Sequence, residues 1–105
     1  MARPVSVLVT YFPTKGKELA FLGVLKRHWP ALKNARLVAP GRPQLWKASD
    51  KSTGRKYFVE MFAWKDARAP REAHETPEVL AVWEAMEKLL DSMDIGIVKA
   101  LKLTW

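Results

Sequence analysis

Hydrophobic and polar positions along the chain change their spacing several times, and these changes predict the helices and strands. Residues 5–12 are apolar at almost every position, which is typical of a strand covered on both faces, by helices or by a second sheet. Residues 44–49 and 56–64 have strand composition, and the turn-forming residues 50–54 predict a hairpin between them. Residues 36–39 are predicted as a strand that is bent or lies at a sheet edge, because two prolines follow closely.

The first amphipathic helix is predicted over residues 15–28, with Thr14 as its N-cap and Pro30 as its end, where one short turn can follow. Its buried stripe is expected to contain Leu19, Leu22, Leu25 and Trp29, widened by Phe21 and Val24. Residues 65–71 are predicted as a polar connection without regular structure.

The second helix is predicted to begin at Thr76 and Pro77, because Thr can cap a helix and Pro fits its first turn, and to end near Asp91. Apolar residues at the spacing of one helical face are Val79, Val82, Trp83, Met86, Leu89, Leu90 and Met93. Residues 94–96 predict a turn, and residues 97–105 are predicted as the last strand.

This order of elements is β-α-β-β-α-β, and it predicts a single α+β domain over residues 1–105. The corresponding architecture is ferredoxin-like, with a four-stranded antiparallel sheet and both helices on one face. The strands carry apolar residues on both sides, so the uncovered face would expose a large apolar patch. We therefore expect a homodimer in which two sheets pack face to face.

The composition narrows the class of protein. Hydrophobic residues make up 49% of the chain, and no apolar run reaches the roughly 20 residues of a membrane span. The absence of cysteine excludes disulfides and thiolate chemistry. With no pattern typical of a signal peptide at the start, a cytoplasmic protein without membrane association is expected.

The net charge of +7 is unevenly distributed. Residues 1–56 hold 12 Lys and Arg against two acidic residues, whereas residues 57–105 hold six against nine. A basic half can attract nucleic acid or an anionic ligand, although these charges are scattered singly, as on solvated surfaces.

Three stretches together resemble a known family: Phe58-Val-Glu-Met-Phe-Ala-Trp64, Ala73-His-Glu-Thr-Pro-Glu-Val79 and Trp83-Glu-Ala-Met86. They resemble the antibiotic biosynthesis monooxygenase-like members of the dimeric α+β barrel superfamily. The resemblance implies a homodimer whose two sheets form a barrel, with a ligand pocket between sheet and helices in each subunit. Some such proteins are cofactor-independent monooxygenases of aromatic polyketides, some degrade haem, and many have no assigned activity.

Cofactors are not predicted. Haem-degrading relatives use an Asn in the first strand, whereas the only Asn here, Asn34, lies outside that strand. Two distant histidines without cysteine do not make a metal-ligand set. The resemblance and the residues therefore predict no flavin, haem or metal.

Two candidate catalytic residues lie near the centre of these motifs, His74 and Glu60. His74 can act as a general base or donate a hydrogen bond to a phenolate, or it can be a structural residue at a helix entrance. Glu60 stands among apolar neighbours, so it either lines a pocket with a raised pKa or pairs with a cation. Its alternation with Phe58, Phe62 and Trp64 leads us to place it under the helices, beside His74.

Aromatic residues are candidates for ligand contact. Trp64 and Trp83 can stack on a planar ligand or simply belong to the core. Tyr11 and Thr10 of the first strand are further candidates, with Ser6 and Trp46 weaker ones. His28, the other histidine, is expected to serve the dipole of its helix or to face solvent.

These observations predict a homodimer that binds a small apolar or aromatic molecule and acts on it as a cofactor-independent monooxygenase. A non-catalytic ligand-binding or structural dimer is the main alternative. An RNA-recognition module has the same order of elements. It is disfavoured because Lys56 stands where an aromatic residue is needed and Glu60 would repel phosphate.

Overall fold

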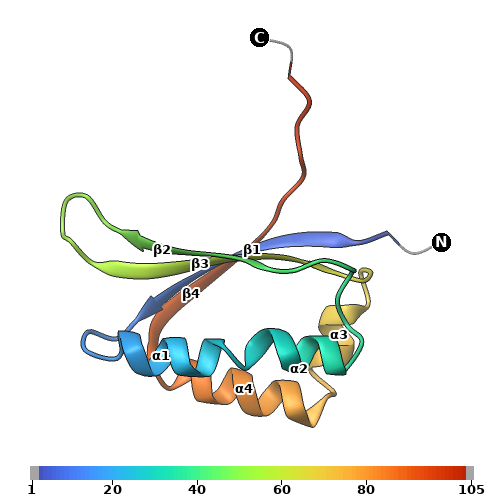
Figure 1. The fold of residues 1–105 in the computed structure, drawn as a ribbon, viewed down its shortest axis with the longest axis horizontal. Helices are drawn as coiled ribbons and strands as arrows, with labels where there is room; N and C mark the ends of the chain where they lie inside the picture. Colours follow the sequence, from blue (N-terminus) through green and yellow to red (C-terminus); the bar gives the residue numbers. More distant parts are fainter. Residues whose placement is uncertain (1–2, 104–105) are drawn as a thin grey trace.

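The structure, a computed structural model, describes residues 3–103 and consists of a four-stranded sheet with helices on one face (Figure 1). Its elements are β1 (Val5–Pro13), α1 (Glu18–Leu25), α2 (His28–Asn34), β2 (Gln44–Ser49), β3 (Lys56–Trp64), α3 (Ala69–Ala73), α4 (Pro77–Glu87) and β4 (Leu90–Ile97). The strand order is β2-β3-β1-β4, and every neighbouring pair is antiparallel. The predicted ferredoxin-like, α+β architecture is confirmed.

The pairing of the central strands β1 and β3 decides which side chains face the helices. Val9 lies opposite Glu60, and Val7 lies opposite Phe62. Because directly paired residues point to the same side of a sheet, these side chains share one face, which we call the inner face. Its buried members on β1 and β3 are Val7, Val9, Tyr11, Phe58, Glu60, Phe62 and Trp64. The predicted position of Glu60 under the helices is confirmed.

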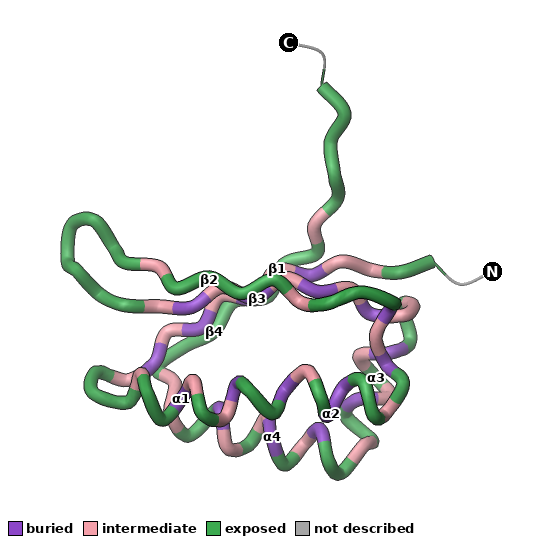
Figure 2. Tube along the Cα trace, in the orientation of Figure 1, coloured by how far each residue is buried: buried purple, intermediate pink, exposed green. Residues whose placement is uncertain are grey.

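The opposite, outer face of the sheet is covered by no helix in the described part of the chain (Figure 1). It carries Leu8, Thr10, Phe12, Tyr57, Val59 and Met61 of β1 and β3, all half-buried. Figure 2 shows the resulting alternation of buried and half-buried positions along the central strands. The core therefore lies between the inner face and the helices.

The predicted first helix is divided in two. α1 ends at Leu25 and α2 begins at His28, so Pro30 lies inside the first turn of α2 instead of ending a helix. Proline is tolerated there because the first backbone N–H groups of a helix have no partner within it. The predicted stripe is partly wrong, since Leu19 is 84% exposed whereas Phe21 is fully buried.

α2 ends in a defined turn that directs the chain back to the sheet. The amide of Leu37 donates to the carbonyl of Leu32, and the amide of Arg36 donates to that of Lys33. Arg36 has a φ of 59°, the left-handed conformation that this type of helix end requires. Residues 36–39 form a single bridge, Val38 with Trp64, in place of the predicted strand.

The hairpin and the following connection agree only in part with the prediction. β2 and β3 have the predicted bounds and are joined by the expected turn, in which Asp50 accepts hydrogen bonds from the amides of Ser52 and Thr53. The polar connection contains the short helix α3, which was not predicted. Pro77 begins α4 as expected, but the hydroxyl of Thr76 donates to the carbonyl of Glu72 and caps no amide of α4.

β4 is the largest departure from the prediction. α4 ends at Glu87, so the predicted helix end near Asp91 is wrong, and residues 94–96 lie inside β4 instead of forming a turn. Residues 98–103 have no regular secondary structure, and residues 104–105 of the predicted strand lie outside the described residues.

The physical reason is an ambiguous pattern. Leu89, Leu90 and Met93 continue the helical spacing of α4, whereas Met93, Ile95 and Ile97 have the two-residue spacing of a strand. In the fold, Met93 pairs with Tyr11 and Ile97 with Val7. Pairing with β1 therefore decides the secondary structure of this segment.

Candidate functional site

A cavity of about 960 Å³ lies between the inner face of the sheet and the helices α2, α3 and α4. Its walls are mostly apolar, with Val7, Val9, Phe62 and Trp64 on the sheet side. Small-molecule pockets usually measure about 300–1,000 Å³ and combine apolar walls with a few polar groups. The cavity therefore has the size and character of a site for a small organic molecule.

The cavity opens along β4. Met93, Ile95 and Ile97 line it from the inner face, and Ile95 and Ile97 are 62% and 71% exposed. The helices thus leave the inner face of β4 uncovered. The lining residues with polar side-chain groups are Tyr11, His28, His74, Trp83, Glu87, Asp91 and Ser92.

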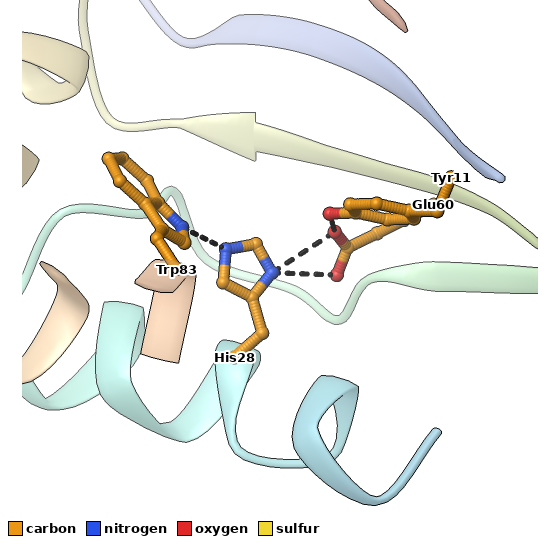
Figure 3. A network of polar contacts seen from close by, with 4 residues as sticks. All are labelled: Tyr11, His28, Glu60 and Trp83. Carbon is orange, nitrogen blue, oxygen red and sulfur yellow. Dashed lines mark hydrogen bonds and ion pairs between the residues drawn. The ribbon is translucent and has the colours of Figure 1, made fainter. Parts of the chain in front are cut away.

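A buried chain of hydrogen bonds joins four side chains from four elements at the inner wall (Figure 3). The hydroxyl of Tyr11 donates to Oε1 of Glu60 at 2.6 Å. Nδ1 of His28 lies 3.1 Å and 3.2 Å from the two carboxylate oxygens of Glu60. Nε1 of Trp83 lies 2.9 Å from Nε2 of His28. We call Tyr11, Glu60, His28 and Trp83 the buried chain.

The chemistry of the donors fixes the tautomer of His28. The indole nitrogen of Trp83 can only donate, so Nε2 of His28 must accept and carries no proton. The proton of the neutral ring is then on Nδ1, which donates to the carboxylate of Glu60. An orienting carboxylate at Nδ1 and a lone pair at Nε2 are the arrangement in which histidine acts as a base.

Burial also affects the protonation of Tyr11, at the other end of the buried chain. Tyr11, Glu60 and His28 are only 1%, 1% and 3% exposed. Burial raises the pKa of Tyr11 far above its ordinary value of 10.0, and the negative charge and hydrogen bond of Glu60 raise the pKa further. Tyr11 therefore remains a hydrogen-bond donor at neutral pH. Among the described residues, every buried polar side-chain atom has a hydrogen-bond partner.

His74 lies just before α4, at the border of the cavity. Its ring centroid is 5.0 Å from that of Trp83, in an edge-on arrangement, and the residue is exposed. Its side chain takes part in no hydrogen bond within residues 3–103, and the carboxylate of Glu60 is bonded to His28 instead. The expectation that Glu60 orients His74 is thus not met, although both lie on the helix-covered side of the sheet.

The other candidate residues divide between the two faces of the sheet. Trp64, Trp83 and Tyr11 line the cavity, as the prediction of ligand contact requires. Thr10 and Ser6 alternate with the inner-face residues of β1, so they lie on the outer face and away from the cavity. The prediction that Thr10 contacts a ligand in this cavity is therefore wrong. Trp46 of β2 also lies on the outer face, opposite Val59.

His28 is the residue that sequence reasoning assigned wrongly. It is the first residue of α2 instead of the last part of a helix, and its ring is buried in contact with Glu60 and Trp83. One signal was available in the sequence: Phe21, Leu25, His28 and Leu32 have the spacing of a single helical face, and all four are buried. Within the described residues, Glu60 bonds to Tyr11 and His28, and the Lys or Arg partner that was predicted for it is not found.

No family model matches the sequence, and a search of curated proteins finds no match. Solved structures match the fold. A variant of SnoaB, a cofactor-independent oxygenase from Streptomyces nogalater, is similar with a TM-score of 0.71 and 19% identity over 97% of each chain. An antibiotic biosynthesis monooxygenase has a TM-score of 0.71 and 14% identity, over 93% of this chain and 99% of that chain. The protein At3g17210 from Arabidopsis thaliana has a TM-score of 0.72 and 13% identity, over 97% of this chain and all (100%) of that chain.

The chain therefore shares the fold of these proteins, among them an antibiotic biosynthesis monooxygenase, and this is the fold that the sequence resemblance predicted. At such low identities the likeness establishes the fold, and the chemistry has to be argued from the site. Over residues 3–103, no helix is long and apolar enough to cross a membrane. The same part of the chain has no cluster of three His, Cys, Asp or Glu residues that could hold a metal ion.

Proposed function

We propose that the protein binds a small aromatic molecule in the cavity and oxidises it as a cofactor-independent monooxygenase. The observation that carries the proposal is the mostly apolar cavity with imidazole and indole side chains on one wall. Similarity in fold to SnoaB, a cofactor-independent oxygenase, supports the same reaction class. Trp64, Trp83 and Tyr11 would contact the ligand.

The reaction requires a substrate whose carbon can be deprotonated. An aromatic ketone with an activated methylene group loses a proton, and the resulting carbanion adds O₂ to give a hydroperoxide. Loss of water from the hydroperoxide leaves a carbonyl group, so that one O₂ supplies the new oxygen and one water. We assign the first proton transfer to His74, whose ring borders the cavity and makes no hydrogen bond with another side chain among the described residues.

We further propose that the protein works as a homodimer. The outer face carries Leu8, Phe12, Val59 and Met61, and no helix of residues 3–103 covers it. Stable monomers rarely expose a contiguous apolar face of this kind, and a second copy packed sheet to sheet would remove it from water.

The experiment is oxygen consumption with anthrone, a tricyclic ketone with an activated methylene group, measured with an oxygen electrode in metal-free buffer. We expect consumption above the uncatalysed rate, falling about 100-fold in His74→Ala. Glu75→Ala, at the exposed neighbouring position, is the matched control and should keep the rate.

Two results would change the proposal. If anthrone binds without oxygen consumption, the protein is a non-catalytic ligand-binding dimer, which is the alternative that the same cavity supports. If His74→Ala loses its fold, as judged by circular dichroism, His74 has a structural role at the entrance of α4 instead of a catalytic one.

A further inference from the structure

We propose that His28 and Glu60 form a second proton-accepting pair in the cavity wall, which binds a phenolic hydroxyl group of the ligand as its phenolate. This inference rests on the proposed function, because the ligand is the same aromatic molecule. It assigns to the buried chain a role different from that of His74, which acts on carbon.

The first argument is the direction of the lone pair on Nε2 of His28. Nδ1 of His28 is within hydrogen-bond distance of both oxygens of Glu60, so its proton is committed to the carboxylate. The basic nitrogen, Nε2, is directed toward Trp83, and both His28 and Trp83 line the cavity. The acceptor of the pair is therefore directed at Trp83, a residue of the cavity wall (Figure 3).

The second argument is that Trp83 can be replaced at Nε2. Trp83 is half-buried and borders the cavity, whereas Tyr11, Glu60 and His28 are almost fully buried. A ligand O–H can take the place of the indole N–H as the donor to Nε2, so the number of hydrogen bonds to His28 does not change. Trp83 thus acts as a cap on the basic nitrogen.

The third argument is that the buried chain adds little to the stability of the core, so a role in ligand chemistry would explain its presence. Burying an imidazole, a carboxylate and a phenol is costly, and apolar side chains of similar volume often stabilise a core at least as well. In the proposed step the ligand O–H bond breaks and its electron pair remains on oxygen. The proton moves to Nε2, and the resulting imidazolium is held by Glu60 through Nδ1.

The electrostatic surroundings include groups from every neighbouring element. Glu60 faces His28 from β3 and Tyr11 donates to Glu60 from β1. His74, Glu87 and Asp91 border the same cavity. The negative charge closest to the imidazolium is that of Glu60, which makes it the group on which the step depends.

The test uses 1-naphthol, whose absorbance changes on ionisation, and 1-methoxynaphthalene, which has no proton to lose. At pH 7 we expect wild-type protein to bind 1-naphthol as naphtholate. Glu60→Gln should lower the ratio of ionised to neutral bound naphthol about tenfold, equivalent to about one pKa unit, while binding of the methyl ether stays unchanged. Glu72→Gln, which removes an exposed carboxylate paired with Lys65, is the matched control.

Trp83→Phe separates this proposal from a purely structural role of the buried chain. It removes the indole N–H and keeps an aromatic ring, so 1-naphthol no longer has to displace a donor from Nε2. Affinity for 1-naphthol should rise about fivefold relative to that for the methyl ether. A structural chain predicts equal losses for both ligands. Trp46→Phe, on the outer face, is the control.

Tyr11→Phe is the second variant if Glu60→Gln does not fold. It removes one hydrogen bond from Glu60 and leaves the contact with His28, so the ratio of ionised to neutral bound naphthol should rise. The proposal is overturned if wild-type protein binds naphthol only in its neutral form, or if the ionised fraction falls in Tyr11→Phe. If naphtholate is bound but anthrone consumes no oxygen, the oxygenase function fails and the proton-accepting pair stands. If neither naphthalene binds, both proposals fail.

Discussion

The two faces of the sheet are both apolar, but they reach burial in different ways. Alternate residues of β1 and β3 on the inner face are covered by helices of the same chain, and they enclose the carboxylate of Glu60 with its hydrogen-bond donors. The outer face has no such polar group on β3, and there Phe12 stacks on Tyr57 with ring centroids 5.3 Å apart. We therefore propose that the inner face carries the chemistry and that the outer face serves association.

Because of this difference, substitutions on the two faces should affect different properties of the protein. Substitutions at the centre of the inner face should act on folding and ligand chemistry, because every group there depends on a partner within the chain. Substitutions on the outer face should act on self-association. Each prediction below tests one side of this division.

The largest effect is expected for Glu60→Leu. The substitution leaves the Nδ1–H of His28 and the hydroxyl of Tyr11 buried without an acceptor. We expect a loss of about 3–5 kcal/mol in the free energy of unfolding, measured by urea denaturation followed by circular dichroism. Glu72→Leu at the surface should cost less than about 1 kcal/mol. Equal losses of unfolding free energy in the two variants would show that the buried chain stabilises the fold no more than a surface ion pair does.

Met61→Lys tests the outer face. A lysine at the centre of a sheet-to-sheet interface introduces an unpaired charge in each copy, so the dissociation constant of the dimer should rise at least about 100-fold. Sedimentation velocity at micromolar concentration measures this change. Leu19→Lys, on α1 at a position 84% exposed, is the matched control and should leave association unchanged. If the wild-type protein sediments as a stable monomer, the proposed sheet-to-sheet dimer is wrong.

Tyr11→Phe tests how strongly the inner face depends on pH. At neutral pH the loss of one donor to Glu60 should lower the free energy of unfolding by about 1–2 kcal/mol. The raised pKa of Tyr11 means that the folded chain keeps its proton above pH 10.0, where the unfolded chain loses it. The wild type therefore loses stability as pH rises through this range, and the phenylalanine variant lacks this loss. The difference between the two proteins should shrink from pH 7 to about pH 11 in urea titrations. A difference that stays constant would contradict the raised pKa.

The smallest effect on stability is expected for Ile95→Lys, at the open edge of the inner face. Ile95 is already 62% exposed, so the free energy of unfolding should change by less than about 0.5 kcal/mol. Because Ile95 lines the cavity, a charge there should weaken binding of 1-methoxynaphthalene about tenfold, as followed by tryptophan fluorescence. Unchanged binding would place the ligand elsewhere.

Local pattern in the sequence was enough for much of the sheet and for one side of the site. The bounds of β2 and β3, the beginning of α4 and the face of Glu60 follow from periodicity and turn chemistry. These features depend on residues only a few positions apart, where spacing translates directly into geometry. The same pattern identified Tyr11, Trp64 and Trp83, which line the cavity.

Only the tertiary structure decided the rest. The sequence from Leu89 to Ile97 fits both a helix and a strand, and pairing with β1 selects the strand. The partner of Glu60 is His28, 32 positions away in the chain, and the cap on His28 is Trp83, 55 positions away. Such contacts arise when α2 and α4 pack on the sheet, because a buried carboxylate takes whichever donor the packing brings within reach.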